Sequence, residues 1–322
     1  MSISVVIQQM MIIFILILMG MLLYKREMLS EMTARQFSGL IVNLTNPALL
    51  ICSALREGPK VSLQELGRAL TVDLVIYAVL IAASFLLPYI LRVPDRCHYA
   101  YQMLTVFGNV GFIGIPLASA VLGTESLIFV SIYNLLFNVL IYTFGMSILQ
   151  RASIRQAAGR QEELSEEASG SRQNGRWKKL INVGTISAVA TIFLYLSDFH
   201  APQVFSSTLT YIGQTTTFLS MLVLGVSVAQ MTLRDIFSHP RLYGFILLRQ
   251  ILLPIGCILL LRPFLASELL LNTTVLMLAV PAGNMPLMLS KQLHVETDTI
   301  SQGIILTTVL SLVTIPVVSL FL

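Results

Sequence analysis

The sequence predicts an all-α polytopic membrane protein with ten transmembrane helices, arranged as two inverted five-helix repeats. Three observations carry this prediction: the composition, a series of ten long apolar segments, and the placement of the basic residues. The chain has 322 residues, of which 56% are hydrophobic and 11% charged, and its mean hydropathy is +0.82. Soluble domains carry about 25% charged residues. The composition therefore places most of this chain in a lipid bilayer.

The ten apolar segments are each about 18 to 24 residues long, which is enough for a helix to cross the hydrocarbon core. Their predicted limits are 5–24, 36–55, 70–91, 99–122, 126–149, 180–197, 207–230, 242–264, 270–290 and 300–322. The first segment has no basic residue before it and no small-residue cleavage site after it. It is predicted to be a membrane helix and not a cleaved signal peptide.

The basic residues support the ten-helix prediction. If the spans alternate, 15 of the 20 Lys and Arg residues fall on the side of the odd-numbered connections. The positive-inside rule then places these connections in the cytoplasm and both termini outside. The longest polar segment divides the chain into a first repeat (1–150), a cytoplasmic loop (151–179) and a second repeat (180–322). Five spans are an odd number, so the second repeat is inverted relative to the first.

Two of the ten segments are poor continuous helices. The fourth contains GNVGFIGIP (Gly108–Pro116), and the ninth contains VPAGNMP (Val280–Pro286). Glycine permits sharp turns and close approach, and proline blocks helix continuation. Irregular backbone at membrane depth is tolerated only inside protein or beside a cavity. We therefore predict a pair of broken helices whose N-terminal ends attract an anion, with Asn109 and Asn284 as hydrogen-bonding groups. The alternative is two ordinary kinks, in which each asparagine bonds a neighbouring carbonyl.

Other polar residues lie inside the predicted spans. Asp73 and Arg249 are the most interior ionisable residues, and such groups are costly unless paired or functional. Asp73 is a candidate proton or ion carrier. The competing interpretations are a structural ion pair and a side chain that extends to the membrane interface. Asn134 and Asn138 share one helical face and either line a cavity or bond a neighbouring helix. The same two interpretations apply to Thr45, Asn46 and their neighbours in the second span. Packing is favoured for the polar residues near the start of the seventh, which are Gln214, Thr215, Thr216 and Thr217.

No known catalytic or cofactor-binding pattern is present. The chain lacks HExxH, GxSxG, Walker and GxGxxG motifs, and its four histidines lie in connections. The three cysteines show no metal-ligand spacing. We expect no enzyme activity, no cofactor and no metal site. The net charge of +4 is attributed to membrane topology, so no nucleic-acid partner is expected.

Five segments resemble the auxin efflux carrier family, which includes plant PIN carriers and bacterial malonate or malate permease-like proteins. These are NLTNPALL, GNVGFIGIPLASAVLG, IGQTTTFLSMLVLGVSVA, AVPAGNMPLMLSKQL and TTVLSLVTIP. The resemblance covers nearly the whole chain, and its most specific part is the fourth span. It implies a fold similar to bile-acid symporters, in which helices 4 and 9 unwind and cross at prolines. Transferred by motif, the residues of the crossing are Asn109, Gly111, Gly114, Pro116, Pro281, Gly283, Asn284 and Pro286. Asp73, Asn134 and Asn138 become supporting residues.

The resemblance also implies a function. We expect a secondary carrier in a bacterial cytoplasmic membrane, which moves a small organic anion, most simply a carboxylate, by elevator-like alternating access. The alternatives are a sodium- or proton-coupled carrier of the bile-acid-symporter type, and a membrane sensor that signals through the central loop. The short loop favours a bacterial relative over a plant carrier. The sequence leaves open whether the chain forms a homodimer.

Overall fold

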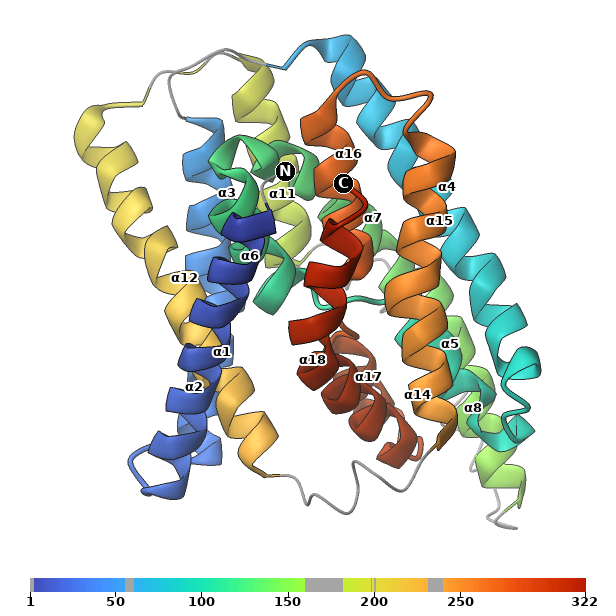
Figure 1. Ribbon diagram of the computed structural model, residues 1–322. Helices are drawn as coiled ribbons and strands as arrows, with labels where there is room; N and C mark the ends of the chain where they lie inside the picture. Colours follow the sequence, from blue (N-terminus) through green and yellow to red (C-terminus); the bar gives the residue numbers. More distant parts are fainter. Residues whose placement is uncertain (1–2, 56–60, 160–181, 198, 200, 231–239) are drawn as a thin grey trace, which may run out of the picture.

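A computed structural model describes residues 3–55, 61–159, 182–197, 199, 201–230 and 240–322, and in these residues the chain is helical without β-strands (Figure 1). The first half contains α1 (Ile3–Lys25), α2 (Glu31–Leu40), η1 (Ile41–Thr45), α3 (Asn46–Ala54), α4 (Leu63–Ile90), η2 (Asp95–Cys97), α5 (His98–Val106), η3 (Val110–Gly114), α6 (Ile115–Leu122), η4 (Thr124–Ser126), α7 (Leu127–Leu140), η5 (Ile141–Gly145) and α8 (Met146–Gly159).

The second half contains α11 (Val183–Ser197), α12 (Gln203–Ala229), α14 (Pro240–Ile246), η6 (Leu247–Leu252), α15 (Leu253–Leu261), α16 (Glu268–Ala279), α17 (Met285–Gln292) and α18 (Asp298–Ser319). Helix α8 continues to Gly159, beyond the start of the predicted central loop at residue 151. The rest of that loop, residues 160–179, lies outside the described residues.

Seven helical stretches in the described residues are long and apolar enough to cross a membrane. Three further apolar helices are shorter: Val110–Leu122, Val183–Ser197 and Glu268–Ala279. Two of these belong to the fourth and ninth predicted spans, where glycine and proline interrupt the helix. The third belongs to the sixth predicted span, of which residues 180 and 181 are not described. The observed fold is thus an all-helical bundle with seven candidate membrane-spanning helices.

Three of the helical stretches contain a π-helical turn immediately before a proline. The turns η1, η3 and η6 lead into α3, α6 and α15, and each of these helices has proline in its first turn. Proline has no N–H donor and its ring crowds the carbonyl four residues earlier. A π-turn inserts one residue into the helix and so changes the position of that carbonyl. The three prolines therefore interrupt their spans locally without ending them.

Helices α1 and α12 pack closely through glycine. A Cβ atom on Gly20 would lie 2.6 Å from the carbonyl oxygen of Leu222, so only glycine allows this approach. Small residues allow membrane helices to approach in this way. Helix α12 also packs against α2, η1 and α3, and this group lies on the left of Figure 1. Helices α4, α5, α8, α14 and α15 lie on the right, with α16 and α18 between the two groups.

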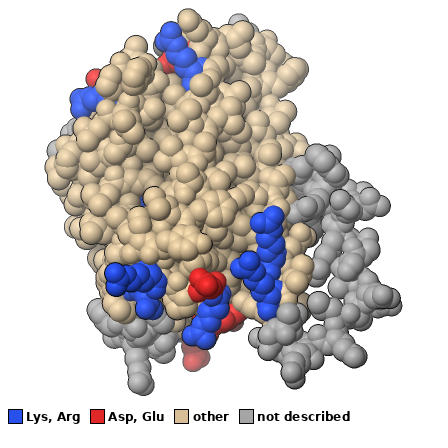
Figure 2. All heavy atoms as spheres, turned by 90° about the vertical axis from the view of Figure 1, so that its right-hand side faces the viewer, with Lys and Arg blue, Asp and Glu red and all other residues tan. Residues whose placement is uncertain are grey.

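The charged side chains mark the two ends of the bundle. Figure 2 shows Lys and Arg at the top and the bottom of one face, with more at the bottom, separated by a broad band of uncharged residues. The first turns of α1 and the last turns of α18 both point toward the upper end in Figure 1. The lower end holds the turns after α1, before α5 and before α18. Such a band is the surface expected of a protein embedded in a bilayer.

Candidate functional site

The first interrupted span leaves the helical conformation after Val106. Phe107 is extended, with φ −106° and ψ 90°, and the helix restarts as η3 at Val110. Gly108 has no room for a side chain, because a Cβ atom would lie 2.8 Å from Cγ2 of Val280 in the second interrupted span. The side chain of Asn109 caps η3, since its Oδ1 accepts a hydrogen bond of 3.2 Å from the backbone N–H of Phe112.

The second interrupted span crosses the first at this point. Between α16 and α17 the backbone forms an antiparallel bridge in which Gly108 faces Ala282. The N–H of Asn109 donates to the carbonyl of Pro281 at 2.7 Å, and the N–H of Gly283 donates to the carbonyl of Phe107 at 2.9 Å. These reciprocal bonds satisfy polar backbone groups that lipid could not satisfy. We call residues 107–114 the first limb and residues 280–286 the second limb of the crossing.

Four helix ends meet at the crossing. Helices α5 and α16 end at the crossing, and η3 and α17 begin there. Unpaired carbonyls give a helix C-terminus a partial negative charge, and unpaired N–H groups give an N-terminus a partial positive charge. The N-terminal ends therefore favour an anion, whereas the two C-terminal ends require a cation or other donors.

Arg249 supplies these donors. It lies in η6, is 3% exposed, and reaches both C-terminal ends with one guanidinium group. Its Nε donates to the carbonyl of Thr105 at 2.6 Å, and its Nη1 donates to the carbonyl of Leu278 at 2.5 Å. Charge-assisted bonds are roughly twice as strong as neutral ones. One fixed positive charge thus stabilises the two half-helices and joins them to each other.

The side chain of Asn109 has one unused polar atom. Its Oδ1 caps η3, but its Nδ2 is buried without a hydrogen-bond partner among the described residues. Asn46 in α3 touches the same limb, because its Nδ2 donates to the carbonyl of Gly111 at 3.0 Å. The Oδ1 of Asn46 is also buried without a partner. A buried polar group without a partner costs about 1–3 kcal/mol, so a ligand that satisfies both atoms would be bound favourably.

Further unpartnered hydroxyls belong to the helices that face the first limb. Helix α12 packs against η1, η3 and α3, and a Cβ atom on Gly213 would lie 2.9 Å from Cα of Leu49. Thr216 and Ser220 follow Gly213 by one and two turns, and Thr45 precedes Leu49 by one turn. The hydroxyls of Thr45, Thr216 and Ser220 are buried and have no partner. The helices beside the first limb therefore carry several polar atoms without a partner among the described residues.

The remaining residues predicted in the first limb have packing contacts. A Cβ atom added to Gly111 would lie 3.4 Å from Nδ2 of Asn46. A Cβ atom added to Gly114 would lie 3.1 Å from Sδ of Met277 in α16. Pro116 is buried in the first turn of α6. These three residues let the restarted helix pack closely against α3 and α16.

The second limb is supported mainly by α18. The Oγ1 of Thr307 accepts a hydrogen bond of 3.2 Å from the N–H of Ala282, and its carbonyl accepts one from Gln250 at 3.2 Å. Pro286 is buried in the first turn of α17. Asn284 stands at the N-terminus of α17, is partly exposed, and makes no side-chain cap. The side-chain amide of Asn284 forms no hydrogen bond with a described residue. Because Asn284 is also partly exposed, this amide is accessible to a ligand.

Asn134 and Asn138 lie on a different face of α7 from the residues that contact the crossing. Asn138 donates to the carbonyl of Asn134 at 2.8 Å and contacts α11, where its Nδ2 lies 3.3 Å from the missing Cβ of Gly184. Phe137, on the adjacent face, packs edge-to-face on Phe107 with ring centroids 5.7 Å apart. The two asparagines are therefore placed between α7 and α11, and the structure does not join them to either limb by a hydrogen bond.

Asp73 lies on the buried face of α4 and is 2% exposed. It forms neither a hydrogen bond nor an ion pair with any described residue, so the expected alternative of a structural pair with Arg249 is not observed. Tyr77, one turn later, stacks on Tyr133 of α7 with ring centroids 4.8 Å apart. The hydroxyl of Tyr77 also lies 3.5 Å from the carbonyl oxygen of Tyr133, to which it donates. Asp73 thus lies one turn before the residue through which α4 contacts α7.

The described residues contain no group of three or more His, Cys, Asp or Glu side chains that could hold a metal ion. What the crossing offers is hydrogen bonding and helix-end charge. Sequence reasoning found the two limbs but treated Arg249 and Asn46 as secondary. Arg249 carried one usable signal, since it lies deep inside a predicted span, whereas Arg262, the other Lys or Arg within a span, lies at the end of the same one. Asn46 precedes a proline within a span, as Met285 does in the second limb and Ile115 does just after the first.

An apolar helical bundle with two interrupted helices that cross inside it defines a polytopic membrane protein of the transporter class. A family model described as membrane transport protein matches residues 5–319. The chain therefore belongs to this family, the auxin efflux carrier family. A search among curated proteins found no significant match.

Proposed function

We propose that this membrane transport protein is a secondary carrier that moves a small organic anion, most simply a carboxylate, and binds it beside the crossing. The observation that carries the proposal is the buried Nδ2 of Asn109, which has no partner and lies at the N-terminus of η3. A carboxylate would accept from this donor and would be stabilised by the positive end of the helix. The accessible amide of Asn284, at the N-terminus of α17, provides a second donor.

The finer architecture proposed for this carrier is ten spans in two inverted repeats, residues 1–150 and 180–322, joined by the loop 151–179. The antiparallel bridge supports it. If two inverted repeats are related by a twofold axis, that axis exchanges the two residues that face each other in an antiparallel bridge. Gly108 and Ala282 face each other in this way, and the hydrogen bonds on either side of them are reciprocal. An alignment of the two halves that matches Gly108 with Ala282 is shifted by one residue from an alignment that matches Asn109 with Asn284. Binding sites at the interface of broken helices are typical of inverted-repeat transporters.

Alternating access is proposed to be elevator-like. The bundle that carries the crossing (α4–α8 and α14–α18) moves against the group formed by α1, α2, α3, α11 and α12. The unpartnered atoms of Thr45, Asn46, Thr216 and Ser220 belong to the second group, in which α12 packs against η3 and Asn46 donates to Gly111 of the first limb. A substrate held at this interface would contact both groups. We place both termini outside and the central loop inside a bacterial cytoplasmic membrane, following the distribution of Lys and Arg.

The arrangement around Arg249 bears on ion coupling. In many carriers, the C-terminal ends of half-helices and unwound carbonyls hold a coupling sodium ion. Here the guanidinium of Arg249 already donates to a carbonyl at each of the two C-terminal ends. This supports a carrier that needs no sodium ion at the crossing and leaves Asp73 as the candidate for proton coupling. The sodium-coupled alternative remains an outcome of the experiment below.

The proposal can be tested with the purified chain in proteoliposomes. A thermal-shift screen of mono-, di- and tricarboxylates, with sodium or with choline as the cation, selects ligands, and radiolabelled uptake then measures their transport. We expect saturable uptake of at least one carboxylate, unchanged when choline replaces sodium. A carboxylate that stabilises wild-type protein but equally stabilises Asn109→Asp protein would contradict the proposed site. Uptake that depends on sodium would favour the bile-acid-symporter type of coupling.

The same assay separates a carrier from a sensor. Deleting residues 161–175 removes half of the central loop. A carrier keeps its uptake after this deletion, because the proposed site lies in the helical bundle. A sensor that signals through the loop would show no uptake with or without it.

A further inference from the structure

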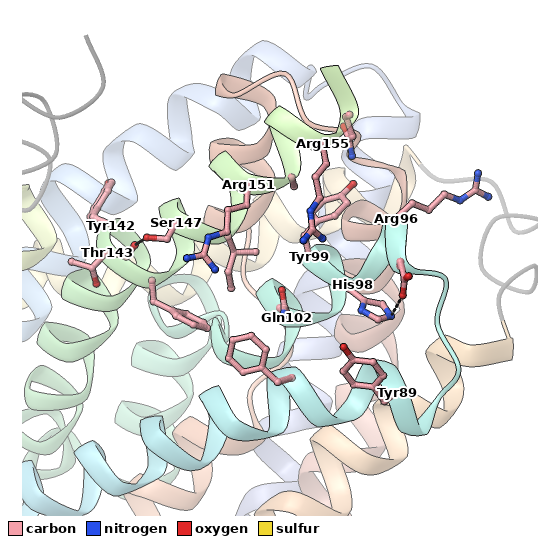
Figure 3. A pocket seen from close by; sticks show the side chains of 16 residues that line it. Tyr89, Arg96, His98, Tyr99, Gln102, Tyr142, Thr143, Ser147, Arg151 and Arg155 are labelled. Atoms are coloured by element: carbon pink, nitrogen blue, oxygen red, sulfur yellow. Dashed lines mark hydrogen bonds and ion pairs between the residues drawn. The ribbon is translucent and has the colours of Figure 1, made fainter. Parts of the chain in front are cut away.

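A polar cavity lies away from the crossing, at the end of the molecule where α4 ends and α5 begins. It has a volume of about 1010 Å³ and is lined by the last turns of α4, by η2, by the start of α5, and by η5 and α8 (Figure 3). None of the limb residues lines it. Its function is therefore not explained by the proposed substrate site.

One side of the cavity is apolar and lies beside exposed apolar residues of α4. Phe85 of α4 packs edge-to-face on Phe144 of η5, with ring centroids 6.1 Å apart. Phe85 is 47% exposed, and its neighbours Leu86 and Ile90 are 58% and 55% exposed. Tyr89, one turn beyond Phe85, is exposed and packs on His98 with ring centroids 5.1 Å apart. Aromatic residues that mark an apolar-to-polar change along one helix are typical of the membrane–water interface.

The other side of the cavity is basic. Arg151 and Arg155 are one turn apart on α8, and Figure 3 shows both side chains extending into the cavity, with that of Arg155 close to Tyr99. Arg96 belongs to the same lining. In the described part of the chain no carboxylate lies within 4.0 Å of these three guanidinium groups. The nearby Asp95 instead pairs with His98, at 3.4 Å. The cavity thus has an excess of positive charge.

The basic side is held by hydrogen bonds to the turn before α18. Ser153 donates to the carbonyl of Leu293 at 3.0 Å, and the N–H of Glu296 donates to Oε1 of Gln156 at 3.0 Å. Tyr99 donates to the carbonyl of Glu296 at 2.6 Å. These bonds fix the last turns of α8 against α5 and the turn. The two arginines are therefore presented from a fixed helix.

We propose that this cavity binds the headgroup of an anionic phospholipid, with the phosphate between Arg151 and Arg155 and an acyl chain along Phe85 and Phe144. A soluble anion would use the basic side only, whereas the exposed apolar side continues directly into the lipid-facing surface of α4. The cavity also lies at the end of the bundle to which the positive-inside rule assigns the cytoplasm, where anionic lipids attract basic side chains. The proposal does not depend on the identity of the transported substrate.

The test measures lipid binding to the full-length protein in detergent by native mass spectrometry. Phosphatidylglycerol and phosphatidylcholine with identical acyl chains are titrated, and the ratio of their dissociation constants gives the preference for the anionic headgroup. We expect wild-type protein to prefer phosphatidylglycerol. Each basic residue near an anionic surface contributes roughly fivefold in affinity, so Arg151→Gln with Arg155→Gln should reduce the preference by at least about tenfold.

Two matched variants act as controls. Arg26→Gln with Arg35→Gln removes two exposed arginines from the same end of the molecule and should leave the preference unchanged. Arg151→Lys with Arg155→Lys keeps the two positive charges and should retain most of the preference for phosphatidylglycerol. The proposal is overturned if wild-type protein does not distinguish the two lipids, or if the control pair lowers the preference as much as the test pair. It is also overturned if inorganic phosphate or glycerol 3-phosphate displaces phosphatidylglycerol, because that would identify a site for soluble anions.

Discussion

The two limbs of the crossing have similar sequences but different environments. In the first limb Asn109 is 3% exposed, caps η3 through Oδ1 and keeps a buried Nδ2 without a partner. In the second limb Asn284 stands at the N-terminus of α17, is partly exposed and caps nothing. The first limb is packed against α12 and α16 and accepts a hydrogen bond from Asn46 of α3. The second limb is held from behind by Thr307 of α18.

This difference separates two tasks that one asparagine could perform. Asn109 is fixed by its own cap, so its free N–H₂ group is presented without loss of side-chain freedom when a ligand binds. Asn284 is free to move and would lose that freedom on binding. We infer that the first limb supplies the specific donor and that the second limb closes on the ligand.

Replacing Arg249 should have the largest effect because Arg249 serves both limbs. In Arg249→Ala, two buried carbonyls lose their donor, which we expect to lower the free energy of unfolding by about 2–5 kcal/mol. Uptake should be abolished. Arg249→Lys keeps the charge, but one ammonium group does not reproduce the forked geometry, so uptake should recover only in part. Thermal unfolding in detergent and uptake in proteoliposomes measure both effects. An Arg249→Ala protein with wild-type thermal stability would show that the two carbonyl bonds do not hold the crossing.

Glycine substitutions compare how tightly the two limbs approach each other. A Cβ on Gly283 would lie 2.7 Å from the carbonyl oxygen of Gly108, which is backbone and does not yield. Gly283→Ala should therefore cost about 1–3 kcal/mol in stability and most of the uptake. Gly111→Ala should be milder, because its nearest neighbour is the side chain of Asn46 at 3.4 Å.

The matched control for these variants is Gly256→Ala in α15, where no atom lies within 4 Å of the new Cβ. Alanine is also a better helix former than glycine, so this change should be neutral or slightly stabilising. Equal losses for Gly283→Ala and Gly256→Ala would mean that close approach of the limbs is unimportant.

Asn109→Asp separates the cap from the ligand donor. Aspartate keeps an oxygen that accepts the bond from Phe112, so the thermal stability of the free protein should be almost unchanged. It replaces the unpartnered N–H₂ group with an oxygen that repels a carboxylate. We expect the affinity for the transported anion to fall by about 10- to 100-fold. Asn284→Asp should weaken binding less, since Asn284 is not pre-positioned. If the two substitutions have equal effects, the inferred division between the limbs is wrong.

The sequence predicted the crossing well because its signal is local. Glycine, asparagine and proline inside an apolar segment are incompatible with a continuous helix, and this can be read without knowing any contact. Pairing needs tertiary information. The carbonyl partners of Arg249 lie 144 and 29 residues away and have no sequence signature, because every residue has a carbonyl. The charge of Arg249 suggested a carboxylate partner, but in the structure Arg249 donates to backbone carbonyls at the ends of two helices.

The supporting residues show the same limit. The spacing of Asn134 and Asn138 indicated a shared helical face, and the structure shows them on one face, joined by a bond within α7. The spacing did not reveal that this face meets α11 and that Tyr133 and Phe137 occupy the adjacent face. Which helix a polar face meets depends on how the helices pack, and the spacing of polar residues along one helix identifies the face but not its partner.

The last comparison concerns the two buried charges, one in each half. Asp73 has no partner among the described residues, whereas Arg249 bonds two carbonyls. Asp73→Asn preserves shape, so stability should change by less than about 1 kcal/mol, because the substitution breaks no hydrogen bond or ion pair with a described residue. If Asp73 carries the coupling proton, uptake by Asp73→Asn protein should continue at a reduced rate and lose its dependence on the pH gradient. The test compares uptake by the two proteins under an imposed pH gradient and, separately, under an imposed sodium gradient. If Asp73→Asn protein depends on both gradients as the wild-type protein does, Asp73 has no coupling role. A large loss of stability in Asp73→Asn would instead show that Asp73, like Arg249, is a structural residue, and the two halves would then be alike in this respect.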